Sequence, residues 1–170
     1  MAYRLSLRSM ERARKVDPRL LAIVVIALDR CPVDFGFTED QSRTVAEQAE
    51  KVRRGVSQTM NSKHVIPDGQ AFSTGVDLVP YVDGIFQWGD NQWRVTTKAG
   101  ATIDVFYEIA AAMRAAAISA GFRIRWGGCW DKCLNDLPAG AAAMKAAVEG
   151  YKTRHPGPDF LDGPHFELLA

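Results

Sequence analysis

The sequence predicts an α+β fold in a single domain, in which a small antiparallel sheet packs against helices. Helical and strand patterns follow one another without the regular strand–helix alternation that a doubly wound parallel sheet requires. The length of 170 residues fits one domain, and 47% hydrophobic with 24% charged residues is an ordinary globular composition. We therefore expect one folded unit over residues 1–170, without internal repeats.

Charge and hydropathy exclude several classes of protein. A net charge of +1 argues against a polycation built for nucleic acid. The longest apolar run, residues 20–28, is far shorter than the roughly 20 residues that cross a bilayer. Residues 1–15 are basic and lack an apolar core, so no signal peptide is expected. The basic side chains within residues 4–19 form either a solvated face or a surface attracted to anions.

The N-terminal third predicts two helices and a strand. Asp17 followed by Pro18 is typical of a helix start, and residues 18–30 are apolar on nearly every side, which indicates a buried helix. Residues 33–38 alternate as in a short strand. Residues 41–54 predict an amphipathic helix, with an apolar face formed by Val45, Ala49 and Val52.

The middle of the chain predicts a long loop and a hairpin. Residues 56–76 lack a helical period and contain Pro67, Gly69 and Gly75. Residues 76–82 alternate as in a strand, the pair Asp83-Gly84 predicts a tight turn, and residues 85–88 form the returning strand.

The C-terminal part predicts two more helices and two strands. After a polar stretch, residues 103–120 form an alanine-rich helix that ends at Gly121. Residues 123–126 alternate as in a strand, residues 141–153 form a helix, and residues 165–169 are again strand-like.

The chain has only three histidines, and two of them stand beside acidic residues at junctions between loops and strands. His64 precedes the loop that leads to the strand of Asp77, and His165 follows Asp162 by three residues. Two imidazoles and one carboxylate can form a catalytic zinc site with an open fourth position, which a further carboxylate can serve as general base. Spacing alone favours surface histidines with ordinary partners over a zinc site.

A wider set of motifs changes this interpretation. The sequence contains S-K-H at 62–64, V-D-L-V-P-Y at 76–81, W-G-G at 126–128 and D-G-P-H-F-E-L at 162–168. Together they resemble the zinc D-alanyl-D-alanine carboxypeptidase/dipeptidase (VanY-type) family, and most closely the phage L-alanyl-D-glutamate peptidases that act as endolysins. The resemblance extends over residues 34–168. It implies a hedgehog/DD-peptidase-like fold in a single zinc peptidase domain, without a separate cell-wall-binding domain.

The resemblance also implies a metal site. Its ligands to Zn²⁺ would be His64, Asp77 and His165. The family usually places the aspartate seven residues after the first histidine, whereas Asp77 follows His64 by thirteen. An enlarged surface loop accounts for the difference. Asp68 is the alternative ligand, although the residues around Asp77 match the family better.

The remaining site residues follow from the same resemblance. Asp162 matches the general base, and Arg43 would bind a substrate carboxylate or the developing oxyanion, a task suited to a guanidinium that stays charged. Ser62 would support the site through a hydrogen bond. Trp126 and Trp130 flank the Gly-Gly break, and either cleft lining or core packing fits them.

Other polar residues have less specific interpretations. His155 lies at a helix end and is expected to be structural. Cys129 and Cys133 could form a thiol pair or a metal clip, but free thiols fit an odd cysteine count and a reducing compartment better. Asp131 is expected to cap a helix. Glu167 shares a strand face with His165, so it could support the metal site from behind.

The function implied is zinc-dependent hydrolysis of the L-alanyl-D-glutamate bond in the peptidoglycan stem peptide, leading to bacterial lysis. The resemblance further implies a monomer that waits in the host cytoplasm until a holin gives it access to the cell wall. Two alternatives share the same residues. One is a D-alanyl-D-alanine carboxypeptidase or dipeptidase, and the other is a non-catalytic zinc-binding interaction domain.

Overall fold

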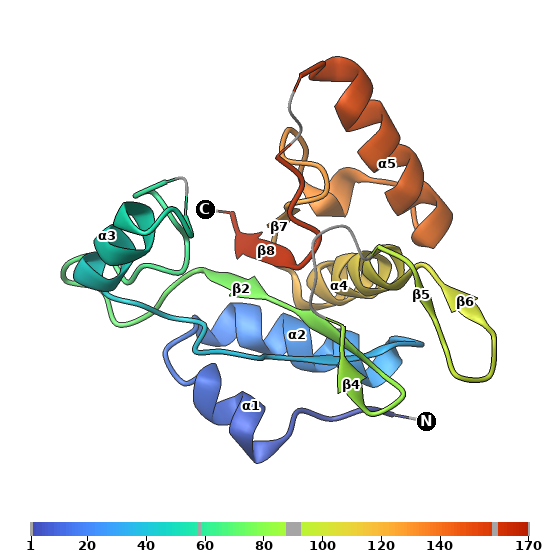
Figure 1. Ribbon diagram of the computed structural model, residues 1–170, viewed down its shortest axis with the longest axis horizontal. Coiled ribbons are helices and arrows are strands. Elements are labelled where there is room, and N and C mark those ends of the chain that lie inside the picture. The colour runs from blue at the N-terminus through green and yellow to red at the C-terminus, as the bar shows by residue number, and fades with distance from the viewer. Residues whose placement is uncertain (1, 58, 88–92, 158–159, 170) are drawn as a thin grey trace.

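The computed structural model describes residues 2–57, 59–87, 93–157 and 160–169. The helices are α1 (Leu7–Arg12), α2 (Pro18–Arg30), α3 (Val45–Arg53), α4 (Val105–Ala120) and α5 (Ala141–Arg154), with a 3₁₀ turn η1 (Leu134–Asp136). The strands are β1 (Asp34–Gly36), β2 (Gly75–Asp77), β3 (Val79–Val82), β4 (Ile85–Phe86), β5 (Val95–Thr96), β6 (Thr102–Ile103), β7 (Ile124–Trp126) and β8 (His165–Leu168). The predicted α+β class is confirmed (Figure 1).

The described strands form three small antiparallel sheets rather than one. Their orders are β1-β3-β4, β2-β8-β7 and β5-β6. In the second sheet β8, the last strand of the chain, lies in the centre and pairs Asp77 with His165 and Trp126 with Phe166. This sheet therefore joins segments that are far apart in the sequence.

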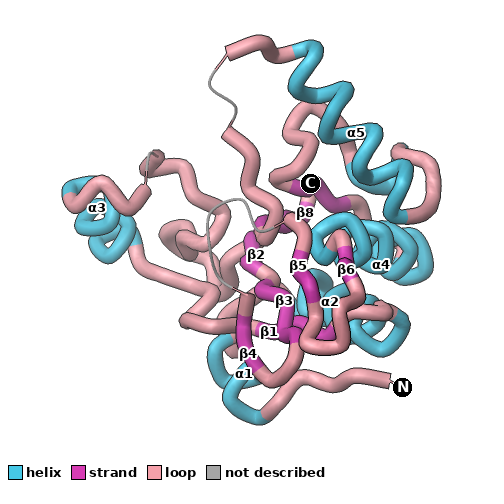
Figure 2. Tube along the Cα trace, turned by 45° about the vertical axis from the view of Figure 1, so that its right-hand side comes forward, coloured by secondary structure: helices cyan, strands magenta, loops and turns pink. Residues whose placement is uncertain are grey.

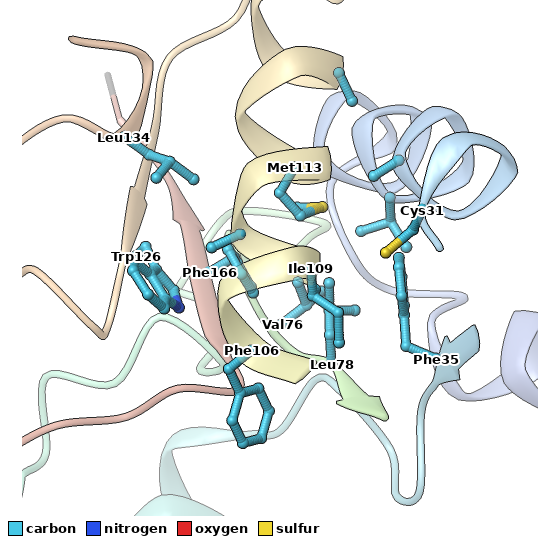
Figure 3. Close-up of a cluster of buried hydrophobic side chains, with 14 of the residues drawn as sticks. Cys31, Phe35, Val76, Leu78, Phe106, Ile109, Met113, Trp126, Leu134 and Phe166 are labelled. Atoms are coloured by element: carbon cyan, nitrogen blue, oxygen red, sulfur yellow. The ribbon is translucent and has the colours of Figure 1, made fainter. Parts of the chain in front are cut away.

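The core lies between α2, α4 and the second sheet. Figure 3 shows Ile109 and Met113 of α4 between Phe35 on one side and Phe166 on the other. Val76 of β2 is also fully buried, so the sheet that carries the site is anchored directly in the core. Burying a side chain of this size contributes about 1.5–3 kcal/mol.

Helix α2 begins where the sequence predicts. The Asp17 carboxylate accepts a hydrogen bond from the Arg19 backbone N–H at 2.9 Å, and Pro18 occupies the first turn. The helix packs along α4, but Val25 on its outer side is 46% exposed. It is therefore buried on one broad face and not all round.

Helix α3 differs from its prediction in two ways. It begins at Val45 and not at residue 41, because the Thr44 hydroxyl accepts from the Glu47 backbone N–H and the Glu47 carboxylate accepts from the Thr44 backbone N–H. Its buried residue is Gln48, whereas Val45 is 47% exposed. Figure 1 and Figure 2 show that α3 stands away from the other helices, which agrees with this exposure.

Turn chemistry fixes the predicted hairpin. Asp83 and Gly84 both have positive φ, at 53° and 84°, as a type I′ turn between β3 and β4 requires. The returning strand ends at Phe86, and residue 88 of the predicted strand lies outside the described residues. The β5–β6 hairpin was not expected, because its two-residue strands are too short to show alternation.

The strand expected over residues 76–82 is divided into β2 and β3, which belong to different sheets, and α1 was not expected. The remaining elements follow their predictions closely. Helix α4 begins two residues later than expected and ends at Gly121, whose φ of 75° is the left-handed conformation that terminates a helix. Along the part of the chain that the structure describes, every helix is too short or too polar to span a bilayer.

Replacing the α2 cap tests the energetic part of this description. Asp17→Ala removes the acceptor for the Arg19 N–H and is expected to lower the free energy of unfolding by about 1 kcal/mol at pH 7. The hydrogen bond from the Arg19 side chain lowers the pKa of Asp17. The stabilisation is therefore present above the usual carboxyl pKa of about 4 and is lost as pH falls through the lower folded value.

Chemical denaturation of both proteins between pH 7 and pH 3 measures this difference. Asp29→Ala is the matched control, because Asp29 is exposed in the last turn of the same helix. The control is expected to stay within about 0.5 kcal/mol of the original protein. A difference in the free energy of unfolding between D17A and the original protein that stays constant down to pH 3 would contradict the assignment.

Candidate metal centre

Three predicted ligands converge on one point. The Asp77 Oδ1 atom lies 3.2 Å from His64 Nε2 and 3.1 Å from His165 Nδ1, and the two ring nitrogens are 3.3 Å apart. One potential ligand atom from each of the three residues lies within 4.8 Å of the other two. Asp77 ends β2 and His165 begins β8, so their direct pairing across the sheet brings them together.

His64 reaches the same point from the loop before β2. Its Nδ1 atom lies 2.8 Å from the Gln41 carbonyl oxygen, which leaves Nε2 facing Asp77. The Gln41 side chain, 1% exposed, accepts from the Asp77 backbone N–H at 2.7 Å. Gln41 thus orients two of the three residues. Sequence reasoning missed it, because a glutamine in a polar segment gives no sign of burial.

The donor set fits a zinc ion. Two imidazole nitrogens and one carboxylate oxygen are a common ligand set of catalytic zinc, and they leave a fourth position open. Asp68, the alternative ligand, is exposed and lies outside this trio. The enlarged loop therefore keeps Asp77, and not Asp68, beside the histidines.

The trio carries complementary charge. Burial by itself would raise the pKa of Asp77, but the neighbouring His64 and His165 hold it below its usual value. Burial disfavours the charged form of His165, yet hydrogen bonds to Asp77 and Glu167 raise its pKa to about 9. The cluster is therefore organised around opposite charges before any metal is considered.

Asp162 lies beside the trio on the segment before β8. Its backbone N–H donates to the Gly127 carbonyl at 3.0 Å, and its carbonyl accepts from the His165 N–H at 3.1 Å. A side chain at Gly127 would collide with the Asp162 backbone, so the glycine permits this close approach. Burial raises the pKa of Asp162 to about 6, and the negative charge of Asp77 is the second cause of this shift.

The trio and Asp162 open into a cleft of about 990 Å³. One wall is formed by α3 and the loop that follows it, and includes Arg43. The Arg43 Nη1 atom donates to Gln48 Oε1 at 3.3 Å, and the buried Gln48 donates in turn to Ser57 Oγ at 2.8 Å. Sequence reasoning missed Gln48, since its burial depends on the loop folding back over α3. The Arg43 backbone N–H also donates to the His64 carbonyl at 2.9 Å.

The opposite wall contains Trp130, and not Trp126. Trp126 is fully buried, stacks on Phe166 and donates from Nε1 to the Gly163 carbonyl at 2.8 Å. Core packing therefore describes Trp126, which supports the segment before His165 from inside. Trp130 lines the cleft, with its ring centre 5.3 Å from that of His165.

Ser62 lies at the edge of the trio. Its hydroxyl accepts from the His64 backbone N–H at 3.4 Å, a long hydrogen bond within the S-K-H motif. Ser62 also lines the cleft, so it is close both to the loop of the first histidine and to the space for a substrate.

His155 and Asp131 lie outside the metal trio and contact each other at the end of α5. His155 caps the end of α5 and lies 3.2 Å from the Asp131 carboxylate, which also accepts from Arg154 at 2.8 Å. Asp131 is thus an ion-pair partner of α5, and its prediction as a helix cap is wrong because no helix begins there. Cys129 and Cys133 are both free thiols.

Comparisons with known proteins agree with this geometry. The family described as phage L-alanyl-D-glutamate peptidase matches residues 1–137, which include His64 and Asp77 and stop short of Asp162 and His165. The crystal structure of the Serratia marcescens L-Ala D-Glu endopeptidase ChiX is similar, with a TM-score of 0.63 and 28% sequence identity over 99% of this chain and 91% of that one. No curated protein sequence matches.

The family match covers well over half of the chain, and the similar structure extends the likeness through the C-terminal segment that supplies His165. The chain therefore belongs to the phage L-alanyl-D-glutamate peptidase family and is a peptidase that acts on peptidoglycan.

Proposed function

We propose that the protein is a zinc-dependent endolysin that hydrolyses the L-alanyl-D-glutamate bond of the peptidoglycan stem peptide. The observation that carries the proposal is the convergence of His64, Asp77 and His165 within 3.1–3.3 Å of one another, beside the half-buried carboxyl group of Asp162 in an open cleft. Membership of the peptidase family supports the same reaction.

The residues have distinct tasks in this proposal. A zinc ion held by His64, Asp77 and His165 would supply a Lewis acid that activates water and polarises the scissile carbonyl. Asp162 would take the proton from the attacking water and deliver it to the leaving amine. Its raised pKa suits a group that must both accept and donate a proton near neutrality.

Arg43 would act on substrate charge from the wall of the cleft that is formed by α3 and the loop that follows it. Arg43 lines the cleft, and Gln48 accepts from one of its guanidinium N–H groups, while no described residue accepts from the others. It would bind a carboxylate of the stem peptide or the oxyanion that develops on the scissile carbonyl. Ser62 would support the site by holding the His64 backbone.

The biological setting follows from the likeness to phage endolysins. We propose that the protein stays in the host cytoplasm until a holin opens the membrane, and then reaches the cell wall. We also propose that it acts as a monomer through a single peptidase domain.

Digestion of purified peptidoglycan tests the reaction. Mass spectrometry of the products, with and without a zinc chelator, is expected to show new amino-terminal D-glutamate that disappears with the chelator. Released D-alanine would instead establish a D-alanyl-D-alanine carboxypeptidase or dipeptidase. A folded, zinc-loaded protein that cleaves nothing would establish a binding domain.

Zinc content tests the ligand assignment. Asp77→Ala is expected to leave the purified protein with little zinc, because it removes the only carboxylate of the trio. Asp68→Ala is the matched control and is expected to keep a full equivalent, since Asp68 lies exposed on the loop. Metal analysis after dialysis measures both, and an empty site in D68A alone would reverse the assignment.

Replacing the general base separates catalysis from metal binding. Asp162→Ala is expected to keep its zinc and to lose about 10²–10⁴-fold in rate, the range typical for a general acid–base group. Asp136→Asn, a change to an exposed carboxylate paired with Arg123, serves as the control. Cleavage rates on peptidoglycan and zinc content are measured together, and undiminished cleavage by D162A would remove Asp162 from the mechanism.

A further inference from the structure

Glu167 is a buried carboxylate directly behind the metal centre. It is 3% exposed and lies on β8 two residues after His165, so both side chains point to the same face of the strand. Its Oε2 atom lies 3.1 Å from His165 Nε2. A carboxylate placed so deeply requires partners that hold its charge.

The contact constrains the tautomer of His165. A carboxylate can only accept hydrogen bonds, so the ring nitrogen that faces it must carry the proton. In the neutral ring the lone pair then lies on Nδ1, which is the atom that faces Asp77 at 3.1 Å and His64 at 3.3 Å. The contact between Nε2 and Glu167 thus leaves Nδ1 as the ligand atom that the ring presents to the trio.

Arg125 holds Glu167 in this orientation. The two residues are direct partners across β7 and β8, and Arg125 donates from Nε to Glu167 Oε1 at 2.9 Å. The guanidinium lies over the ring of Trp130 at 5.9 Å, and that ring lies against His165. Each carboxylate oxygen therefore has its own partner, with Arg125 on one and His165 on the other.

The neighbouring strand leaves room for this arrangement. Gly75 of β2 is the direct partner of Glu167 on the other side of β8. A side chain there would approach His165 Cε1 to 3.1 Å and Lys63 Cβ to 2.8 Å. The glycine therefore gives the imidazole space to stand between Asp77 and Glu167.

We propose that Glu167, held by Arg125, is a positioning residue for the metal: it selects the His165 tautomer whose Nδ1 is free to bind. This inference rests on the proposed zinc site. It assigns to Glu167 and Arg125 a role in metal affinity, whereas the ligands themselves stay unchanged.

Zinc affinity of Glu167→Gln tests the proposal without recourse to activity. The amide keeps the shape of the side chain, but it can donate as well as accept and so no longer requires a proton on Nε2. The zinc Kd, measured by competition with a chromophoric chelator, is expected to rise about 10–100-fold. Glu149→Gln is the matched control, because Glu149 is exposed on α5 and pairs only with Lys152 among the described residues.

A spectroscopic measurement separates positioning from general support of the fold. ¹⁵N correlation spectra of the histidine rings are expected to show the Nε2–H tautomer of His165 in the metal-free original protein, once the ring is neutral. In E167Q they are expected to show a mixture. Circular dichroism and thermal unfolding of the metal-free variants identify any loss of folding, which would act on all ring signals together.

Arg125→Gln provides a second, independent variant should E167Q fail to fold. It leaves Glu167 in place but removes its second partner, so the zinc Kd is expected to rise in the same direction by a smaller factor. If a folded variant binds zinc with the affinity of the original protein and keeps the original tautomer, the inference is overturned and the proposed function stands. An original protein that binds no zinc would overturn the proposed function as well.

Discussion

The antiparallel pairing of β2 with β8 is the contact on which the site depends. It sets Gly75 opposite Glu167, Val76 opposite Phe166 and Asp77 opposite His165. Because strand side chains alternate, Val76 and Phe166 enter the core while the other pairs face the cleft. A slip of one residue would exchange the two sets, so burial of two apolar side chains determines which groups meet in the cleft.

Core residues outside the β2–β8 pairing also position the site. Trp126 lies beneath the site, stacks on Phe166 and holds the Gly163 carbonyl, while the adjacent Gly127 accepts from the backbone of Asp162. The carboxyl group proposed as general base is thus placed by a backbone hydrogen bond to Gly127, directly after β7, and by one from His165 at the start of β8. Residues that never touch the cleft thereby determine the geometry inside it.

Local signals explain which parts of the structure the sequence predicted. Asp17-Pro18, Asp83-Gly84 and Gly121 each act through their own backbone conformation, and the elements that they begin or end were predicted to within a few residues. The start of α3 was missed, because the capping pair of Thr44 and Glu47 outweighed the apolar spacing. The metal trio was predicted from family motifs.

The residues around the trio are positioned by contacts between segments that are far apart in the chain. A single sequence does not reveal such contacts. Gln41 contacts two residues that are 23 and 36 positions away in the chain, and Arg125 is hydrogen-bonded to Glu167, which is 42 positions away. Nothing in the residues near Trp130 distinguishes it from Trp126, although one lines the cleft and the other is buried. Such differences depend on which strand pairs with which.

The cysteines give the fold a tolerance to its redox environment. All three are free thiols, so no disulfide has to form before the protein works, and none can be lost by reduction. Burial raises the pKa of Cys31 to about 12 and that of Cys129 to about 11, which keeps both away from the reactive thiolate form. A protein built in this way does not depend on oxidative maturation, and these two thiols resist unwanted disulfide exchange.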